Sequence, residues 1–182
     1  MKTAIKLAAA GIALSVSAWA SAVPVLTISG QGNAASAAAE TAFLATLGGS
    51  QITETFDTAG YTAGAQSLTI NSAAGVGSFT SVSQGSGGAC DNGGYSCSAG
   101  LAVLNSSTTP FNGRFSVSPR NWLDSMDATE MKISPTAGYD AMGFFMTDPN
   151  DAGGRFDIGG VGFNFTDVFG SAMGSGKIFY IT

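Results

Sequence analysis

Residues 139–165 read YDAMGFFMTDPNDAGGRFDIGGVGFNF, in which apolar and aromatic runs alternate with Asp, Asn, Pro and Gly. Short β-prone runs bounded by such turn residues predict antiparallel strands joined by tight turns. We expect strands at Tyr139–Thr147, Gly154–Ile158 and Val161–Phe165. This stretch therefore indicates a mainly β fold.

The same pattern extends from residue 51 to the end of the chain. The further strands that it predicts are Gln51–Phe56, Ser67–Asn71, Gly77–Val82, Leu101–Leu104, Arg114–Val117, Ala128–Ile133 and Lys177–Ile181. Many short strands at this spacing favour an antiparallel β-sandwich or a jelly roll. The 12 Phe residues suit that architecture, since large rings fill the layer between two sheets.

One short helix is expected before these strands, after a β-like run at Val25–Ser29. Asn33 can cap a helix, an alanine-rich run follows it, and Gly48 ends it. The residues that form its apolar stripe are Phe43, Leu44 and Leu47. We expect this amphipathic helix to pack on the sheet.

The first residues have the parts of a secretory signal peptide. Lys2 and Lys6 give a positive start, and Leu7–Val16 is apolar but too short for a membrane anchor. Cleavage is expected between Ala20 and Ala22. The predicted organisation is a signal peptide at residues 1–22, a strand and helix at residues 23–50, and one β-sandwich domain at residues 51–182. We therefore expect an exported protein of the bacterial cell surface or the extracellular space.

The composition argues against several classes of function. The chain has 7 Lys and Arg against 12 Asp and Glu, and two of the lysines lie in the signal peptide, so the mature protein carries a formal charge of −7. Nucleic acid is therefore not an expected partner, because phosphate binding needs a basic face. The chain has no His, which removes the commonest general base and the Ser-His-Asp and Cys-His catalytic arrangements.

Cys90 and Cys97 are the two cysteines of the chain, with a Gly-rich segment between them. In an oxidising compartment such a pair predicts a local disulfide, here at the tip of a hairpin. The alternative is a redox or metal pair, but the spacing is not CxxC and no further thiol or imidazole completes a zinc site.

The C-terminal run Lys177–Thr182 alternates like a strand and has no turn or charged tail after it. A sheet that ended there would leave an exposed apolar edge, which proteins usually cover or charge. We therefore expect the sequence to be a fragment that lacks its last strands and a sorting tail.

Four carboxylates at strand ends are candidate calcium ligands: Glu54, Asp57, Asp148 and Asp151. Calcium takes six to eight oxygen ligands, which carboxylates and loop carbonyls at Gly-rich turns can supply. The alternative is that Asp148 and Asp151 are ordinary turn residues and that Glu54 and Asp57 lie at a solvated strand end.

A second acidic cluster consists of Asp124, Asp127 and Glu130. Two carboxylates on either side of a glycosidic bond are the equipment of a glycoside hydrolase. The alternative is a solvated acidic loop that leads into a strand.

Trp122, with Arg120 and Asn121 beside it, is the main candidate for carbohydrate binding. An aromatic face can stack on the C–H face of a pyranose while polar neighbours bind its hydroxyls. The other aromatic residues with this potential are Tyr61, Tyr95 and Tyr139. The alternative is that Trp122 belongs to the core or the rim of the sandwich.

Several segments, in order, resemble a group of bacterial exported proteins that end in a PEP-CTERM sorting signal. Ala37–Gly48 running into Thr53–Asp57 is similar to the group's "AAFLAALG…ETFE" opening, and its central motifs are similar to Met131–Pro135, Ala141–Asp148 and Asp151–Gly154. The resemblance implies an exported β-sandwich, sorted by exosortase-type machinery and associated with exopolysaccharide or a surface matrix. It implies no activity. The sorting tail and an Asp-rich final strand typical of the group are not in this sequence, and we expect them in the missing segment.

Three functions follow as expectations. The first is a non-catalytic surface or extracellular-matrix protein, stabilised by calcium. The second is a carbohydrate-binding module that uses Trp122. The third is a glycosidase that uses carboxylates.

Overall fold

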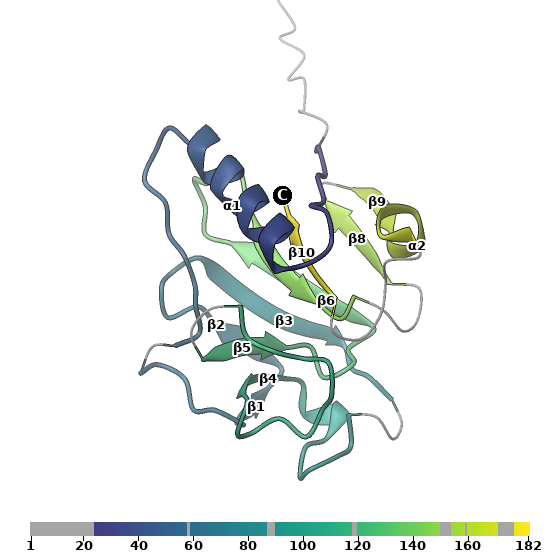
Figure 1. Cartoon of the computed structure of the whole chain (residues 1–182). Helices are drawn as coiled ribbons and strands as arrows, with labels where there is room; N and C mark the ends of the chain where they lie inside the picture. Colours follow the sequence, from purple (N-terminus) through teal and green to yellow (C-terminus); the bar gives the residue numbers. More distant parts are fainter. Residues whose placement is uncertain are drawn as a thin grey trace, which may run out of the picture.

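The computed structural model describes residues 24–57, 59–86, 90–117, 120–149, 154–158, 160–170 and 177–182. The predicted signal peptide and Asp151 lie outside these residues. Within them, the fold is mainly β, with antiparallel sheets and one long helix, as the sequence predicts (Figure 1).

The helices and strands follow one another along the chain in a mostly β order. They are α1 (Asn33–Thr46), β1 (Gln66–Ser67), β2 (Thr69–Asn71), β3 (Gly77–Ser83), a 3-10 turn (Cys97–Ala99), β4 (Leu101–Asn105), β5 (Asn121–Asp124), β6 (Glu130–Pro135), β7 (Phe144–Thr147), β8 (Arg155–Ile158), β9 (Val161–Asn164), α2 (Phe165–Val168) and β10 (Ile178–Ile181). The predicted helix is confirmed. Of the expected apolar stripe, partly buried Phe43 and Leu44 lie in the helix, and partly buried Leu47 follows it directly in an extended conformation.

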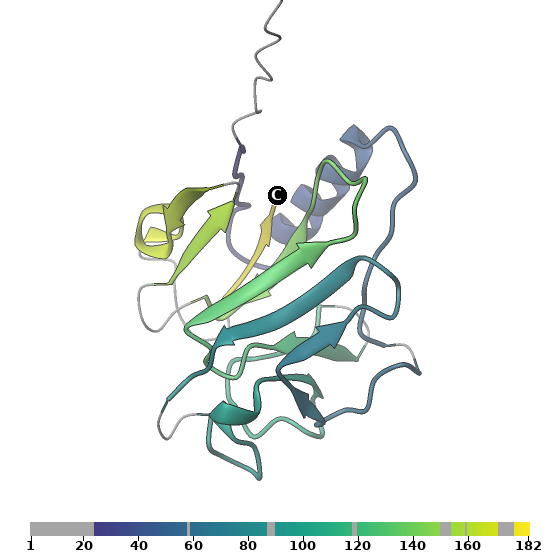
Figure 2. The ribbon, with the colours of Figure 1, turned by 180° about the vertical axis from the view of Figure 1, so that it is seen from behind.

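The described strands form four small antiparallel sheets. Their orders are β1-β4-β5, β2-β3-β6, β10-β7 and β8-β9. The two longest strands, β3 and β6, lie side by side and are seen from behind in Figure 2. A sandwich or jelly roll is a more specific arrangement than four antiparallel sheets, and it stays a prediction.

The strand expectations are right in most places and wrong in four. Gln51–Phe56 and the described residues around Arg114 are irregular and pair with no strand. The N–H of Phe56 donates to the side chain of Glu54, and the side chain of Arg114 pairs with Asp124. β7 begins at Phe144, five residues after the predicted start at Tyr139. No local pattern predicts a strand at β5, although its residues pair with β4 along their whole length.

The last strand is covered, contrary to the expectation of an exposed apolar edge. All four residues of β10 are buried. β7 pairs with one side of β10, and the segment around Ile28 runs along the other side, with Ile28 opposite Ile181. The N–H of Thr27 donates to the carbonyl of Thr182 at 2.6 Å, and the N–H of Thr182 donates back at 2.9 Å. The edge is closed by the N-terminal segment, which is remote in sequence.

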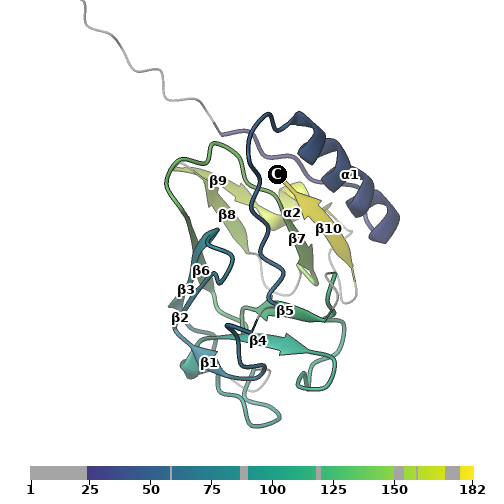
Figure 3. The same cartoon turned by 90° about the vertical axis from the view of Figure 1, so that its left-hand side faces the viewer.

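The helix α1 packs against β10, as Figure 3 shows. Ser36, the one fully buried residue of α1, lies at this contact, with its hydroxyl 2.9 Å from the carbonyl of Gly32 and 3.3 Å from that of Ile178. The N–H of Gly32 also donates to the carbonyl of Ile178 at 2.9 Å. The ring of Phe43 also meets Tyr180, with 6.1 Å between the ring centroids. The helix thus covers β10 on a face of the sheet, while the Ile28 segment covers its edge.

Apolar side chains gather in two separate clusters. The aromatic core contains buried Phe169, Phe179 and Ile181, with Leu26, Ile28, Phe144, Met146, Phe156, Phe165 and Val168 packed on them. The disulfide core contains buried Cys90, Cys97, Ala102, Leu104 and Met126, with Tyr95, Phe111 and Trp122 packed on them. The candidate site residues that the structure describes lie mostly around the second cluster.

Candidate functional site

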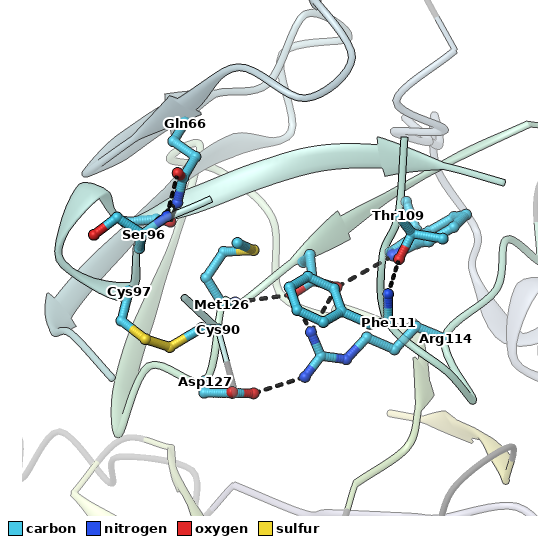
Figure 4. Close-up of polar contacts among 12 residues, drawn as sticks. Gln66, Cys90, Ser96, Cys97, Thr109, Phe111, Arg114, Met126 and Asp127 are labelled. Atoms are coloured by element: carbon cyan, nitrogen blue, oxygen red, sulfur yellow. Dashed lines mark hydrogen bonds and ion pairs between the residues drawn. A yellow bond between two sulfur atoms is a disulfide. The ribbon is translucent and has the colours of Figure 1, made fainter. Parts of the chain in front are cut away.

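An ion-pair network at the disulfide core joins Arg114 to two of the predicted catalytic carboxylates (Figure 4). The guanidinium of Arg114 donates to Asp124 at 3.0 Å and 3.3 Å, and to Asp127 at 2.6 Å. The same guanidinium lies over the ring of Phe111, 4.3 Å from its centroid. One cation therefore holds both carboxylates and packs on an aromatic face.

The backbone around these residues explains their placement. Asp124 is the last residue of β5, and its side chain is 3% exposed. Its Oδ1 accepts the N–H of Met126 at 2.9 Å, which supports a turn in which Met126 and Asp127 adopt positive φ of 53° and 54°. Left-handed backbone is unusual for such residues, so the hydrogen bonds and the burial of Met126 hold it in place.

The expectation of a solvated acidic loop is therefore wrong for Asp124, which is buried and paired. Glu130 lies apart from that turn, exposed at the start of β6 and opposite Ser83. The arrangement is that of a structural ion pair, in which a buried carboxylate is stable only because its charge is compensated.

The predicted disulfide between Cys90 and Cys97 is present, with 5.1 Å between the two Cα atoms. Its position differs from the expected hairpin tip, because the loop that it closes connects β3 and β4, which belong to different sheets. Asp91 accepts the N–H of Cys97 at 2.8 Å inside this loop. The amide side chain of Gln66 also brackets Ser96, with hydrogen bonds of 2.7 Å and 2.9 Å to its carbonyl and N–H. An intramolecular disulfide of this kind indicates an oxidising compartment.

The three predicted carbohydrate-binding residues, Arg120, Asn121 and Trp122, lie on and beside β5. Two of them contact the segment at Phe56 and Asp57. The N–H of Asn121 donates to Asp57 at 3.0 Å, and its side-chain amide donates to the carbonyl of Phe56 at 2.7 Å. Exposed Arg120 lies 3.9 Å from the same carboxylate. Trp122 is half-buried against the disulfide core, and its indole N–H lies 3.4 Å from Asp124.

Glu54 is the centre of a second polar cluster. Its carboxylate accepts hydrogen bonds from the hydroxyls of Tyr61 and Ser72, at 2.6 Å and 2.7 Å. It also accepts the backbone N–H groups of Phe56 and Ala74, at 2.7 Å and 3.1 Å. Burial alone would raise the pKa of Glu54, but these four hydrogen bonds outweigh it and hold the pKa below its usual value. Burial and the hydrogen bond to Glu54 raise the pKa of Tyr61 to about 12, so its hydroxyl stays a donor.

A shallow depression with a volume of about 230 Å³ lies next to the Glu54 cluster. Its lining residues are Gly60, Tyr61, Thr62, Ala65, Gln66, Ser67, Ile70, Asn71 and Val103. Among the aromatic residues predicted to bind sugar, Tyr61 lines it. Asn71 and Thr62 escaped the sequence analysis because nothing in their local sequence indicates a site.

Three of the four predicted calcium ligands are described, and they do not form one cluster. Glu54 and Asp57 lie in the segment tied to β2 and β5, as described above. Asp148 follows β7, where its N–H donates to the carbonyl of Lys177 at 2.9 Å. Among the described residues, no three Asp, Glu, Cys or His side chains are close enough to hold one metal ion. The calcium prediction includes Asp151, which is outside these residues.

No model of a known protein family matches the chain, and neither does any curated protein or solved structure. Neither helix in the described part of the chain has the length and hydropathy needed to span a membrane.

Proposed function

We propose that this chain is an exported, non-catalytic protein of the bacterial cell surface or extracellular matrix. The predicted signal peptide and the disulfide between two buried cysteines support export. The resemblance to PEP-CTERM proteins supports sorting to the outer surface by exosortase-type machinery, with exopolysaccharide or surface matrix as the partner.

The observation that supports a non-catalytic role is that the candidate carboxylates are bonded to partners within the protein. Asp124 and Asp127 share the cation of Arg114, and Glu54 accepts four hydrogen bonds from its own protein. A glycosidase needs one carboxyl that is kept protonated as an acid and a partner that faces the substrate. Groups that stabilise buried turns and loops are better suited to holding a binding surface rigid than to turnover.

Carbohydrate binding is the second candidate function, and the depression beside Tyr61 favours it. A concave surface with an aromatic residue, an amide and hydroxyls is the usual composition of a sugar site. Calcium remains part of the first proposal as a stabilising ion near Asp148 and Asp151.

The proposal is tested by expressing the full chain with its leader in a bacterial host. We expect a processed N-terminus between Ala20 and Ala22 and a product that resists thiol alkylation until it is reduced. A version without residues 1–22 is the control, and it should stay in the cytoplasm with two free thiols.

A leader that stays uncleaved, or protein that stays in the cytoplasm, would contradict export, and secreted protein with free thiols would contradict the disulfide. Hydrolysis of polysaccharides that Asp124→Asn abolishes without unfolding the protein would contradict the non-catalytic assignment. Melting of the secreted protein in excess calcium and in EDTA checks the ion, and equal midpoints would remove it.

A further inference from the structure

The depression beside Tyr61 joins one aromatic ring to apolar and uncharged polar side chains. Tyr61 lies where the depression meets the Glu54 cluster. Half-buried Ile70 and buried Val103 contribute apolar surface to the depression. We propose that it binds one ring of a neutral polysaccharide, with the C–H face of the sugar against Tyr61 and its hydroxyls on Asn71 and Thr62. This inference rests on the proposed function and names the class of ligand.

Tyr61 is fixed before any ligand arrives. Its hydroxyl donates to Glu54 at 2.6 Å and accepts the N–H of Ala73 at 2.7 Å. Phe56 packs against it, with 5.6 Å between the ring centroids. Because the ring is already ordered, stacking a sugar on it costs little conformational entropy.

The polar groups of the lining divide into occupied and available ones. The amide of Gln66 is bonded to Ser96 and Gly100, and the hydroxyl of Ser67 is bonded to Thr69. Asn71 and Thr62 are exposed, and their side chains make no hydrogen bond within the part of the chain that the structure describes. An amide supplies both donors and an acceptor, and a hydroxyl supplies one of each, which matches the vicinal hydroxyls of a sugar.

The charge of the lining decides between neutral and anionic ligands. None of the nine lining residues is charged, and the nearest ionisable cluster is built on the carboxylate of Glu54. A phosphate or a uronate would meet no cation here and would approach an acidic protein. A neutral hexose needs no cation and is not repelled by an acidic protein.

The size of the depression limits the ligand to one ring. Its volume of about 230 Å³ is below the roughly 300–1,000 Å³ typical of pockets that enclose drug-sized molecules. The depression is also shallow, so a ring inside a long chain can lie across it. This favours a polymer over a free monosaccharide.

The experiment measures retention of the secreted, disulfide-bonded protein in affinity gels that contain a neutral glucan, mannan or galactan, or an alginate. We expect retardation by at least one neutral polymer and none by alginate. A free methyl hexoside added to the gel distinguishes a polymer ligand from a free monosaccharide. Competition by the hexoside at low concentration would indicate a monosaccharide site and would contradict the preference for a polymer.

Two variants place the site. Asn71→Ala should weaken binding about tenfold, the scale of one net hydrogen bond, and Tyr61→Leu should abolish it. Asn92→Ala is the matched control, an exposed asparagine outside the depression, and it should leave retardation unchanged. Asn71 is exposed, so its variant is expected to fold even if Tyr61→Leu does not.

Binding that Asn71→Ala leaves as strong as in the wild type, binding to alginate alone, or no retardation by any neutral polymer would overturn the inference. The proposed function fails separately, through an uncleaved leader or through hydrolysis of the polymer in the gel. A secreted and folded protein that binds no neutral polymer would therefore refute the sugar site and leave the export proposal standing.

Discussion

The two clusters of the molecule are stabilised in different ways. The aromatic core packs Phe169 on Phe179, with ring centroids 4.8 Å apart, and Phe165 on Phe156 at 4.7 Å. The disulfide core packs Ala102, Leu104 and Met126 around Cys90 and Cys97, with three aromatic side chains against them, and adds the Arg114 network at its border. Burial of rings stabilises the first cluster, while a covalent bond and ion pairs supplement burial in the second.

The difference follows from the segments that each cluster must fix. The aromatic core is built on the short strands β7, β8 and β10, of which β7 and β10 are mostly apolar and β8 contributes Phe156. The disulfide core fixes long irregular segments between β3, β4 and β5. Such loops carry few large apolar side chains, and burial alone cannot offset the entropy of ordering them. Directional contacts specify a loop conformation that burial would leave undetermined.

The largest effect is expected from Phe179→Ala in the aromatic core. Removing this ring leaves a cavity against Phe169, and the expected loss is about 3–5 kcal/mol of unfolding free energy. Urea denaturation measures it, with Phe179→Leu as a milder control. The loss of unfolding free energy relative to wild type should be the same with and without reductant. A loss that appears only after reduction of the disulfide would show that the two clusters are not independent.

The double variant Cys90→Ala, Cys97→Ala should lose about 2.5 kcal/mol, from the entropy of a short closed loop. The same urea experiment measures it, and reductant should shift the wild type but leave the variant unchanged. We expect this loss to add to that of Phe179→Ala, because the two sites lie in separate clusters. Strong non-additivity would count against the division into two cores.

The smallest effect is expected at Glu54, in the polar cluster outside both cores. Its pKa is lower in the folded protein than the usual 4.5, so its stabilising contribution is complete above 4.5 and disappears as the pH falls through the folded value. Glu54→Gln should lose about 1 kcal/mol at pH 7, the scale of a net hydrogen bond. Melting curves from pH 7 to pH 3 check this, and the difference from wild type should shrink towards the acid end. A difference that grows on acidification would contradict the assignment.

Local patterns were sufficient for much of the fold. The helix from Asn33 and the strands from Gly77, Leu101 and Lys177 follow from runs of suitable residues between turn residues. β5 was missed because Asn121–Asp124 mixes polar and charged residues and becomes a strand only through its pairing with β4. Gln51–Phe56 was overpredicted for the opposite reason, since its β-prone residues find side-chain partners and no strand beside them.

The candidate sites were less predictable than the fold. The sequence offered Asp124 and Asp127 as a catalytic pair, and nothing local indicates that Arg114 would pair with both. It favoured Trp122 as the main sugar-binding aromatic residue and gave Tyr61 only as a further candidate. The structure packs the first against the disulfide core and places the second at a depression. Side-chain roles depend on partners ten or more residues away, which periodicity does not encode.

The sequence by itself determined the β class, the position of α1 and the pairing of the only two cysteines, because each depends on residues close together in the chain. The tertiary structure alone decided which carboxylates are neutralised, that the segment around Ile28 closes the edge of β10, and that Asn71 and Tyr61 line one depression. These features need segments far apart in sequence to meet. Their free energy comes from burial and hydrogen bonding that exist only when the whole chain is folded.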